Sequence, residues 1–486
     1  MDNLKSQGAK AFLWDFFGKM AMHGTAFIVM IFLARLLEPS AFGLVAMVMV
    51  IVSVAKVFTD VGLGGALIQR RRVLPVHYTS VFYFNIFVGA GLTLITFFSA
   101  TLISDFFNNE ELVPIVQVMS VMFLITAFSS VHTNILRKEL NYAALTKVNF
   151  FSALLSGVAG VALAFYGAGV WSLVTQALSR VVFYNLFIWF ASHWIPSLLF
   201  SFKALRQLWG FGFRIFLSGL LETIYTRLDV IIIGKLFTPA ALGFFHQAKA
   251  LDGMIVQYSS GSIMAVLFPI LSKVQNDLPR FQHIAIRTLE IICFVVFLLL
   301  GGVYLVSEEL IVILFTEKWL PAAAYLKILL LSGFAYPIGA LLVNILKGRG
   351  NSKAFLRLEI YKKILLSINF YVGFIWGIEG YLYGLVIVSV LSVALNIVFA
   401  SREIHLPVLQ FIRPMTVQML LSVVAVIFVL YITSGLELNN ILLIVVKGFL
   451  FTFLYFLISA VFRTAPFTTF RNQALQVLRR KNRVKN

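Results

Sequence analysis

Two copies of one short phrase decide how this chain is organised. ARLLEPSAFGLVA runs from Ala34 to Ala46, and GKLFTPAALGFFH runs from Gly234 to His246, 200 positions later. In register, the copies share a leucine, a proline, an alanine and a glycine: Leu36/Leu236, Pro39/Pro239, Ala41/Ala241 and Gly43/Gly243. Each proline ends one helix and opens the next at its first turn. Each glycine, four residues on, lets the new helix approach a neighbour closely.

The composition indicates a membrane protein. The 486 residues are 60% hydrophobic and 12% charged, whereas about 25% of the residues of a soluble protein are charged. Such a chain cannot cover its surface with polar groups, so we expect lipid to be its solvent. The net charge is +19, and a strongly basic balance also occurs in nucleic-acid-binding proteins. We favour basic cytoplasmic loops as its cause and expect no nucleic-acid partner.

Fourteen apolar stretches approach the roughly 20 residues that cross a bilayer. They lie near 11–36, 41–67, 78–103, 113–136, 144–166, 169–192, 210–236, 241–270, 284–306, 320–346, 355–376, 380–401, 414–434 and 440–462. Polar residues interrupt several of them, so twelve or thirteen spans remain an alternative. With the N-terminus inside, the loops alternate between basic and acidic along the chain, which predicts that both termini are cytoplasmic.

The repeated phrase predicts two similar bundles. Six spans separate the copies, and an even number preserves orientation, so the units would be related by an axis along the membrane normal. Turn chemistry alone explains proline and glycine, but not four identities in register. We therefore predict an all-α polytopic membrane protein with six-helix bundles at 1–200 and 201–405, two further spans at 406–465 and a basic cytoplasmic tail at 466–486. A cleft between such bundles suits alternating access.

Two stretches mix apolar and basic residues without forming a span. They are 193–208, HWIPSLLFSFKALRQL, and the tail from Pro466. This composition is typical of helices that lie in the headgroup zone and favour anionic lipid. For the last eight residues of the tail, a solvated basic end is the alternative.

Ionisable residues inside spans cost roughly 2.5–3.5 kcal/mol each on insertion scales, so they mark contacts with protein or water. Here they gather on the first two helices of each predicted bundle: Asp15, Lys19 and His23; Lys56 and Asp60; Arg214, Glu222, Arg227 and Asp229; and His246, Lys249 and Asp252. Residues four apart can form local ion pairs, which is the alternative for Lys56 with Asp60 and for Asp15 with Lys19. Arg214 and Arg227 lack an obvious excess of acids and favour a polyanionic ligand.

Several function classes are excluded by missing motifs. No phosphate-binding P-loop, zinc-peptidase motif or nucleophile elbow occurs. The single cysteine, Cys293, excludes a disulfide framework and cysteine-based metal clusters. No loop is long enough to form a catalytic domain. We therefore expect no enzyme, no metal and no cofactor, and a function driven by an ion gradient, by substrate concentration or by a partner.

The sequence resembles the polysaccharide-exporter branch of the multidrug/oligosaccharidyl-lipid/polysaccharide flippase superfamily. The resemblance is carried by LARLLEPSAFGLVAMVMVIVSVAKVFTDVGLGGALIQR (Leu33–Arg70), ILRKELNYAALTKVNF from Ile135, GAGVWSLVTQAL (Gly167–Leu178) and TRLDVIIIGKLFTPAALGFFHQAKAL (Thr226–Leu251). Within this branch, the chain is most similar to the exporters of colanic acid and teichuronic acid.

The resemblance implies a flippase of the bacterial cytoplasmic (inner) membrane. It implies that the substrate is an undecaprenyl-diphosphate-linked oligosaccharide used for exopolysaccharide, capsule or O-antigen (lipopolysaccharide) assembly. It also implies a partner polymerase, glycosyltransferases of the same pathway and antiport of a proton or sodium ion. Carried onto this chain, the substrate-binding cations are Lys19, Lys56, Arg214, Arg227 and Lys249, and the coupling candidates are Asp15, Asp60, Glu222, Asp229 and Asp252.

Two other functions stay open at this point. A cation-coupled multidrug exporter of the same superfamily would need an acidic and apolar cavity, and the mixture of bases and acids argues against it. A membrane-embedded polysaccharide polymerase would need a large outer loop with catalytic residues. The longest outer segments here, near 104–112 and 307–319, are short and acidic.

Overall fold

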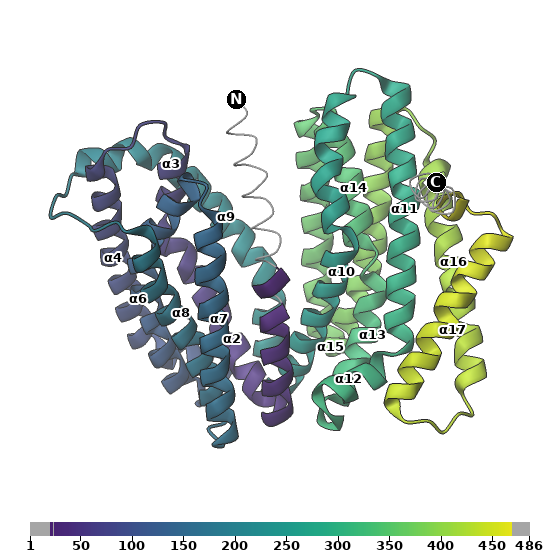
Figure 1. Ribbon diagram of the computed structural model, residues 1–486, viewed down its shortest axis with the longest axis horizontal. Helices are drawn as coiled ribbons and strands as arrows, with labels where there is room; N and C mark the ends of the chain where they lie inside the picture. Colours follow the sequence, from purple (N-terminus) through teal and green to yellow (C-terminus); the bar gives the residue numbers. More distant parts are fainter. Residues whose placement is uncertain (1–19, 23, 469–486) are drawn as a thin grey trace, which may run out of the picture. The chain divides into compact units, whose positions relative to one another are not determined.

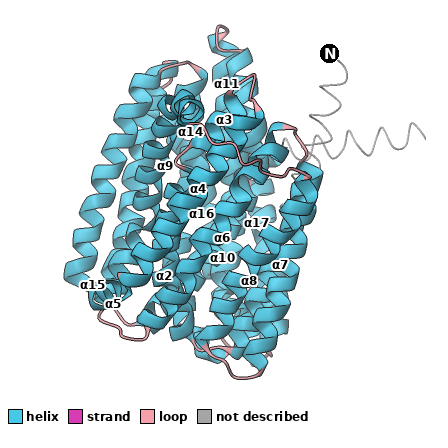
Figure 2. Ribbon diagram, turned by 90° about the vertical axis from the view of Figure 1, so that its left-hand side faces the viewer, coloured by secondary structure: helices cyan, strands magenta, loops and turns pink. Residues whose placement is uncertain are grey.

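The computed structural model describes residues 20–22 and 24–468, with the backbone alone at 257–266 and 268–269. These residues form helices joined by short connections and no strand, as Figure 2 shows. The helices are Met20–Leu36, α2 (Pro39–Asp60), α3 (Leu63–Gln69), α4 (Pro75–Phe98), α5 (Ala100–Phe107), α6 (Leu112–Lys138), α7 (Tyr142–Phe165), α8 (Val170–Ser192), α9 (Phe202–Leu236), α10 (Pro239–Lys273), α11 (Leu278–Leu305), α12 (Ser307–Phe315), η1 (Glu317–Trp319), α13 (Leu320–Ser332), α14 (Ala335–Gly348), α15 (Ser352–Ile404), α16 (Val408–Thr433) and α17 (Asn440–Val461).

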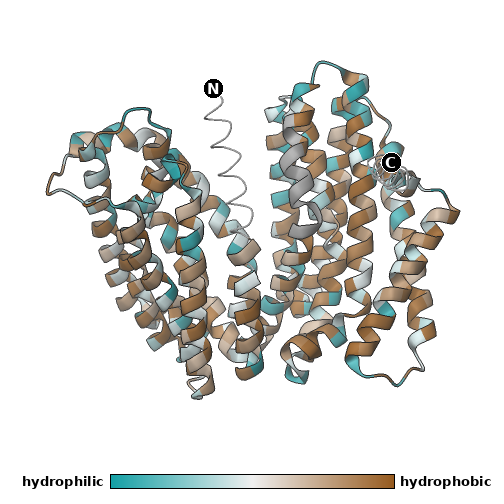
Figure 3. Cartoon of the chain, viewed as in Figure 1, coloured by the Kyte–Doolittle hydropathy of each residue, from teal (hydrophilic) through white to brown (hydrophobic). Residues whose placement is uncertain are grey.

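Each of the fourteen predicted spans overlaps at least one helix in the described part of the chain, and three of them, 41–67, 78–103 and 320–346, cover two. In the described part of the chain, ten helices are long and apolar enough to cross a membrane. One of them, α15, contains two spans, because the backbone leaves the helical region at Gly377 (φ 76°, ψ −168°). The helix Met20–Leu36 and the 35-residue helices α9 and α10 supply the remaining three. Figure 3 shows apolar residues along most of the length of these helices, so the predicted all-α polytopic membrane fold is confirmed.

The chain divides into two compact units, residues 1–246 and 247–486; Figure 1 labels their helices and colours them along the sequence. In unit 1, α7 packs on α8, α4 on α6, and α2 on both α6 and α9. In unit 2, α14 packs on α15, and α11 on α16. The described start of α10 and all of α9 thus cluster with the helices that precede them. The predicted divisions at residues 200 and 405 stay predictions about the repeat.

The two copies of the opening phrase contact each other in unit 1. A Cβ atom built on Gly43 would lie 1.8 Å from the carbonyl oxygen of Pro239, and one built on Gly243 would lie 2.0 Å from that of Pro39. The contact is reciprocal, since the glycine of each copy meets the proline of the other. Neither position has room for a side chain. The phrase therefore occurs twice in the sequence, and its two glycines allow the backbones of α2 and α10 to come into contact near the start of each helix.

The junction between α2 and α3 is a left-handed turn at Val61 (φ 44°) and Gly62 (φ 70°). The turn presses against α9, because a Cβ on Gly62 would lie 2.0 Å from the carbonyl oxygen of Gly212. Lys138, the last residue of α6, donates to the carbonyl oxygens of Leu67 and Arg70, both at 2.7 Å, and so holds the other end of α3. We call this end of unit 1 the α3 end; the α3 label lies at the upper left of Figure 1.

The predicted interfacial helix over 193–208 is wrong for its first nine residues. Residues 193–201 are not helical, and only 202–208 are, as the start of α9. His193 adopts a left-handed conformation (φ 50°) and ends α8. Pro196 has no N–H group to donate to a helix, and the side chain of Ser201 then caps α9 by accepting from the Ala204 N–H at 3.3 Å. The predicted tail lies mostly outside the described residues.

The last two helices are tied to unit 2 by buried polar contacts. Tyr455 of α17 donates to the carbonyl oxygen of Phe294 at 3.1 Å and to Gln418 Oε1 at 2.8 Å. Lys447 of α17 forms an ion pair with Glu309 of α12, and both side chains are largely buried (13% and 11% exposed). These contacts fix α16 and α17 on α11 and α12, around an apolar cluster that includes Phe294, Phe451 and Tyr455.

Candidate functional site

A polar cavity of about 870 Å³ lies inside unit 1. Five helices line it: α2, α6, α7, α8 and α9. Its wall consists of Met49, Val52, Ser53, Lys56, Val57, Thr59, Asp60, Met122, Phe123, Thr126, Ser129, Ser130, Thr133, Asn134, Arg137, Asn149, Ala177, Arg180, Val181, Tyr184, Thr223, Thr226 and Arg227. A space of this size is within the usual range for small-molecule sites.

The charges in this wall are unbalanced. Four cations, Lys56, Arg137, Arg180 and Arg227, face one carboxylate, that of Asp60. Among the described residues, no ion pair within 4.0 Å joins any of them. Lys56, Arg137 and Arg227 are exposed and Arg180 is half-buried. Cations within spans that lack carboxylate partners are suited to an anionic ligand.

Asp60 is held by neutral donors. Its Oδ1 atom accepts from Ser130 Oγ at 3.0 Å and from the Gly64 N–H at 3.2 Å. Ser130 in turn accepts from Asn85 Nδ2 at 3.2 Å. Asn85 is fully buried on α4, so the carboxylate is oriented from behind the cavity wall. The cations of the cavity therefore keep their charge available for a ligand.

Hydroxyl and amide groups form the rest of the polar wall. Thr133 Oγ1 lies 3.0 Å from Tyr184 OH, which joins α6 to α8. Thr133 also donates to the carbonyl oxygen of Ser129 at 2.9 Å. Asn149 of α7 donates to the carbonyl oxygen of Leu145 at 2.8 Å, and the cavity is lined by its side chain. Such groups can donate and accept hydrogen bonds at once, as sugar hydroxyls require.

The four cations lie at successive depths from the α3 end. Arg137 is the penultimate residue of α6, and Lys56 lies four residues, about 6 Å of helix, from the end of α2. Arg180 lies twelve residues, about 18 Å, from the end of α8. Arg227 lies nine residues, about 14 Å, from the opposite end of α9. Positive charge thus continues along the cavity from one end of unit 1 toward its middle.

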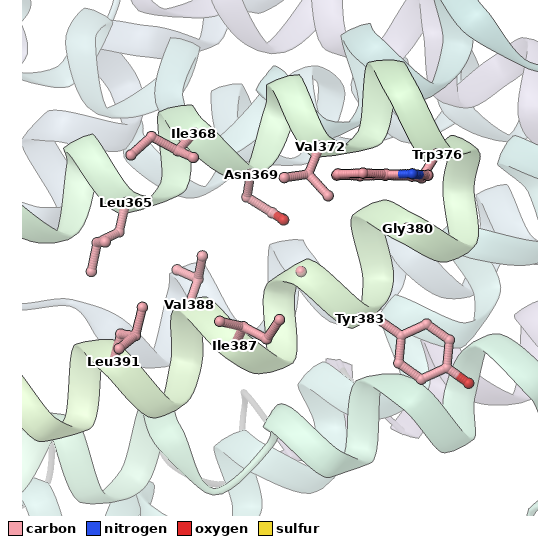
Figure 4. A pocket seen from close by; sticks show the side chains of 11 residues that line it. Leu365, Ile368, Asn369, Val372, Trp376, Gly380, Tyr383, Ile387, Val388 and Leu391 are labelled. Carbon is pink, nitrogen blue, oxygen red and sulfur yellow. The ribbon is translucent and has the colours of Figure 1, made fainter.

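A second cavity, of about 370 Å³, lies in unit 2 between the two arms of α15. Its wall is apolar except at a few points, as Figure 4 shows for Leu365, Ile368, Val372, Ile387 and Leu391. The buried side chain of Asn369 bridges the arms by donating to the carbonyl oxygen of Tyr381 at 3.1 Å. No charged residue lines this cavity in the described part of the chain, so the cavity of unit 1 is the candidate site for a charged ligand.

Comparison with known proteins identifies the family. Residues 32–324 match the family described as polysaccharide biosynthesis protein. The chain belongs to the polysaccharide biosynthesis protein family. The matched residues include α2, α6, α7, α8 and α9, so every helix that lines the cavity of unit 1 lies within the family match.

Curated members and relatives of this family are named for surface polysaccharides. The chain is 28% identical to teichuronic acid biosynthesis protein TuaB of Bacillus subtilis over 57% of this chain and 58% of TuaB, so the match spans less than two thirds of that relative. It is 22% identical to lipopolysaccharide biosynthesis protein WzxC of Escherichia coli, over 80% of this chain and 79% of WzxC. It is 24% identical to succinoglycan biosynthesis transport protein ExoT of Rhizobium meliloti, over 69% of this chain and 68% of ExoT.

Solved structures share the fold. The chain matches an inward closed structure of the lipid II flippase MurJ with a TM-score of 0.70 and 14% identity, over 92% of this chain and 99% of that one. It matches an inward-facing multidrug resistance transporter of the MATE family and MOP superfamily with a TM-score of 0.62 and 16% identity, over 79% and 94% of the two chains. This member of the polysaccharide biosynthesis protein family is therefore a multi-pass membrane protein with the fold of these transporters.

The structure brings three of the ten predicted charged site residues into one cavity: Lys56, Asp60 and Arg227. Glu222 and Arg214 of α9 are exposed, and Asp229 is buried and accepts from the Val230 N–H, but none of the three lines this cavity. Lys249 and Asp252 belong to unit 2. Asp15 and Lys19 lie outside the described residues. The roles of all ten stay predictions.

Two cavity cations were not among the predicted ligands. Arg137 lies just beyond the predicted span 113–136, but α6 continues through it to Lys138. The signal was a polar stripe on α6, with Ser130, Thr133, Asn134 and Arg137 at helical spacing on one face. Arg180 stands near the middle of α8 without an acid four residues away, which indicates a ligand or a water-filled space.

Proposed function

We propose that this protein is a flippase that moves an undecaprenyl-diphosphate-linked oligosaccharide across the bacterial cytoplasmic membrane for surface polysaccharide assembly. One observation carries the proposal: four cations face a single carboxylate in the described wall of a cavity built from transmembrane helices. The family membership and the names of the relatives support the same substrate class.

The charge of the cavity favours a diphosphate. A unit charge about 5 Å from a phosphate oxygen contributes roughly 3 kcal/mol at an effective dielectric constant of 20. Two or three cations acting together therefore attract a diphosphate more strongly than one alone. The hydroxyl and amide wall of Thr133, Tyr184 and Asn149 then offers hydrogen bonds to a saccharide.

The depth of the cations suggests how the anion enters. Arg137 and Lys56 lie near the α3 end, where the loops are basic, and we infer that this end is cytoplasmic. A diphosphate would meet these two side chains first and Arg180 next, deeper in the membrane. The stepwise placement keeps the anion near a cation at each stage and lowers the barrier to entry.

The crossing of the repeated phrases provides the opposing seal. Gly43 and Gly243 bring α2 and α10 to backbone distance at the end of unit 1 away from α3. We infer that this contact closes the outer end while the cavity loads, and that it separates when the protein alternates its access. Release of the oligosaccharide at the outer leaflet would hand it to a polymerase of the same pathway, after glycosyltransferases have built it inside.

Asp60 is the candidate for coupling to a proton or a sodium ion. It is the acid that lies among the cations of the described cavity wall, and its carboxylate is hydrogen-bonded by Ser130 and Gly64. A cation bound there would neutralise Asp60 and raise the net positive charge that faces the substrate. Substrate binding and ion binding are therefore thermodynamically linked at this site.

The rival functions fit this cavity less well. A multidrug exporter for organic cations needs an acidic cavity, and in the described wall the cations outnumber the acid by four to one. A polymerase needs a catalytic group near the saccharide, and the outer connections, such as the turn between α5 and α6, are short. The multidrug rival predicts that loss of a cavity arginine has little effect on export of surface polysaccharide.

Arg227 and Arg214 give a matched test in cells. Both are exposed arginines of α9, but only Arg227 lines the cavity of unit 1. We expect Arg227→Gln to abolish surface polysaccharide and to accumulate lipid-linked oligosaccharide, at a normal level of membrane protein. Arg214→Gln should leave the amounts of surface polysaccharide and of lipid-linked oligosaccharide closer to those of the unaltered protein. Equal export by the two variants would refute a substrate role for the cavity.

A further inference from the structure

The connection between α8 and α9 is built like a membrane-inserting segment. We propose that residues 193–201, here called the strap, insert their outward side chains into the cytoplasmic leaflet, and that the cations beside them bind the headgroups of anionic phospholipid. This interaction surface is separate from the cavity of unit 1 and does not rest on the proposed transport function.

The inward side of the strap is fixed to the first two turns of α4 and to α6. Trp194 packs against Phe82 and His132, with ring centroids 5.7 Å and 5.2 Å away. Ser197 Oγ lies 3.2 Å from Thr79 Oγ1, and the Ser201 N–H donates to Ser80 Oγ at 2.9 Å. The strap therefore has a defined orientation although it has no regular secondary structure.

The outward side is strongly apolar and uncovered by protein. Ile195 is 81% exposed, Leu198 is 95% exposed and Leu199 is 59% exposed. Phe202, at the start of α9, continues this row at 78%. Apolar side chains in such a row, on a segment that is not a span, are typical of elements that lie in the membrane interface.

The backbone of the strap fixes its depth. In the described hydrogen-bond network, no backbone group of residues 195–200 has a protein partner. Unpaired backbone groups are not tolerated in the hydrocarbon core, so this backbone must stay among headgroups and water. Thr79 and Ser80 lie four and five residues past the start of α4, about 6 to 8 Å of helix, which matches the depth of interfacial segments.

Exposed cations flank the strap at headgroup level. Arg71 and Arg72 precede α4, while Lys203 and Arg206 occupy the first turns of α9, and all four are exposed. The two groups are held together, because Arg70 Nη2 donates to Gln207 Oε1 at 2.7 Å. The same arrangement places positive charge above the apolar row, complementary to the phosphates of an anionic monolayer. That complementarity favours lipid over a protein partner.

Labelling of Leu198→Cys tests the insertion. The native Cys293 is fully buried and should not compete for the reagent. In nanodiscs of phosphatidylcholine and phosphatidylglycerol, we expect an NBD label at position 198 to be quenched by brominated acyl chains. A label on Glu110→Cys, in the exposed turn between α5 and α6, should not be quenched. An NBD label at 198 that stays in water, or is shielded from water without quenching, overturns the proposal.

Charge removal tests the lipid class. Arg71→Gln, Arg72→Gln, Lys203→Gln and Arg206→Gln together should weaken the retention of fluorescent phosphatidylglycerol by at least about tenfold, since one basic residue near a membrane surface contributes a factor of about five. Retention of fluorescent phosphatidylcholine should change less than twofold. Equal loss of both lipids, or loss of neither, contradicts the assignment. Neither outcome depends on whether the protein transports an oligosaccharide.

Discussion

The reciprocal crossing of the repeated phrases predicts a specific pattern of non-additive mutations. Gly43→Ala places a Cβ atom 1.8 Å from the Pro239 carbonyl oxygen, and Gly243→Ala places one 2.0 Å from that of Pro39. Real Cβ atoms essentially never come closer than 3.0 Å to such a neighbour, so the turns must separate by about 1 Å in either variant. The obstructing atoms belong to the backbone, and no rotamer change relieves the contact.

The expected cost follows from this displacement. Insertion of a methyl group into a tight contact costs roughly 1–3 kcal/mol. Because one movement of the turns relieves both clashes, the second alanine should cost about 0.5 kcal/mol or less in the background of the first. The double-mutant cycle should therefore show a coupling free energy of about 1–2 kcal/mol. Additive costs would mean that the two clashes are relieved separately.

The assay is unfolding of the purified protein in mixed micelles titrated with SDS and followed by circular dichroism. Gly91→Ala is the matched control, since a Cβ at this helical position meets nothing within 4 Å. We expect it to be neutral or slightly stabilising, because alanine favours the helix. Additive losses from Gly43→Ala and Gly243→Ala, or losses no larger than that of Gly91→Ala, would refute the reasoning.

Three further predictions concern other parts of the chain. Asp60→Asn removes the carboxylate from a described cavity wall that has four cations, so pyrophosphate should bind about tenfold more tightly in isothermal titration. This corresponds to a gain of about 1.4 kcal/mol in binding free energy, and weaker binding would contradict the prediction. Gly62→Ala combines a left-handed φ of 70° with a Cβ 2.0 Å from the Gly212 carbonyl oxygen, so we expect the free energy of unfolding to fall by about 2 kcal/mol or more in the same assay. A fall below about 0.5 kcal/mol would contradict the tight packing of this turn. Lys447→Met leaves the buried Glu309 unpaired and should lower the free energy of unfolding by about 3–5 kcal/mol, whereas the double variant Lys447→Met with Glu309→Gln should recover most of that stability. Equal losses of stability in the two variants would show that the ion pair is not the cause.

The helices were predictable from the sequence because lipid imposes a simple rule. Backbone groups in a bilayer must be paired within the helix, and about 20 apolar residues are needed to cross it. This rule placed each of the fourteen predicted spans over helices in the described part of the chain. The internal repeat stays a prediction, which rests on Pro39 and Pro239 at the same point of the two phrases.

The composition of the site was harder to predict because it depends on which faces meet. Lys56 and Arg227 are 171 positions apart, and only the packing of α2 on α9 brings them to one cavity. Arg137 lies beyond the predicted span 113–136 and next to another cation, Lys138, yet Lys138 contacts α3 while Arg137 lines the cavity. The strap is predicted as a helix because amphipathic composition does not distinguish a helix from an irregular segment held by Ser197 and Ser201.

The most direct test of the cavity as the transport site is flipping by the purified protein. Proteoliposomes would receive a fluorescent undecaprenyl-diphosphate oligosaccharide, and a membrane-impermeant quencher would report its leaflet over time. We predict that the unaltered protein moves the lipid between leaflets and that Arg180→Gln slows this at least about tenfold at equal reconstitution, with Arg214→Gln as the control outside the cavity. Flipping by Arg180→Gln at the rate of the unaltered protein would contradict the account.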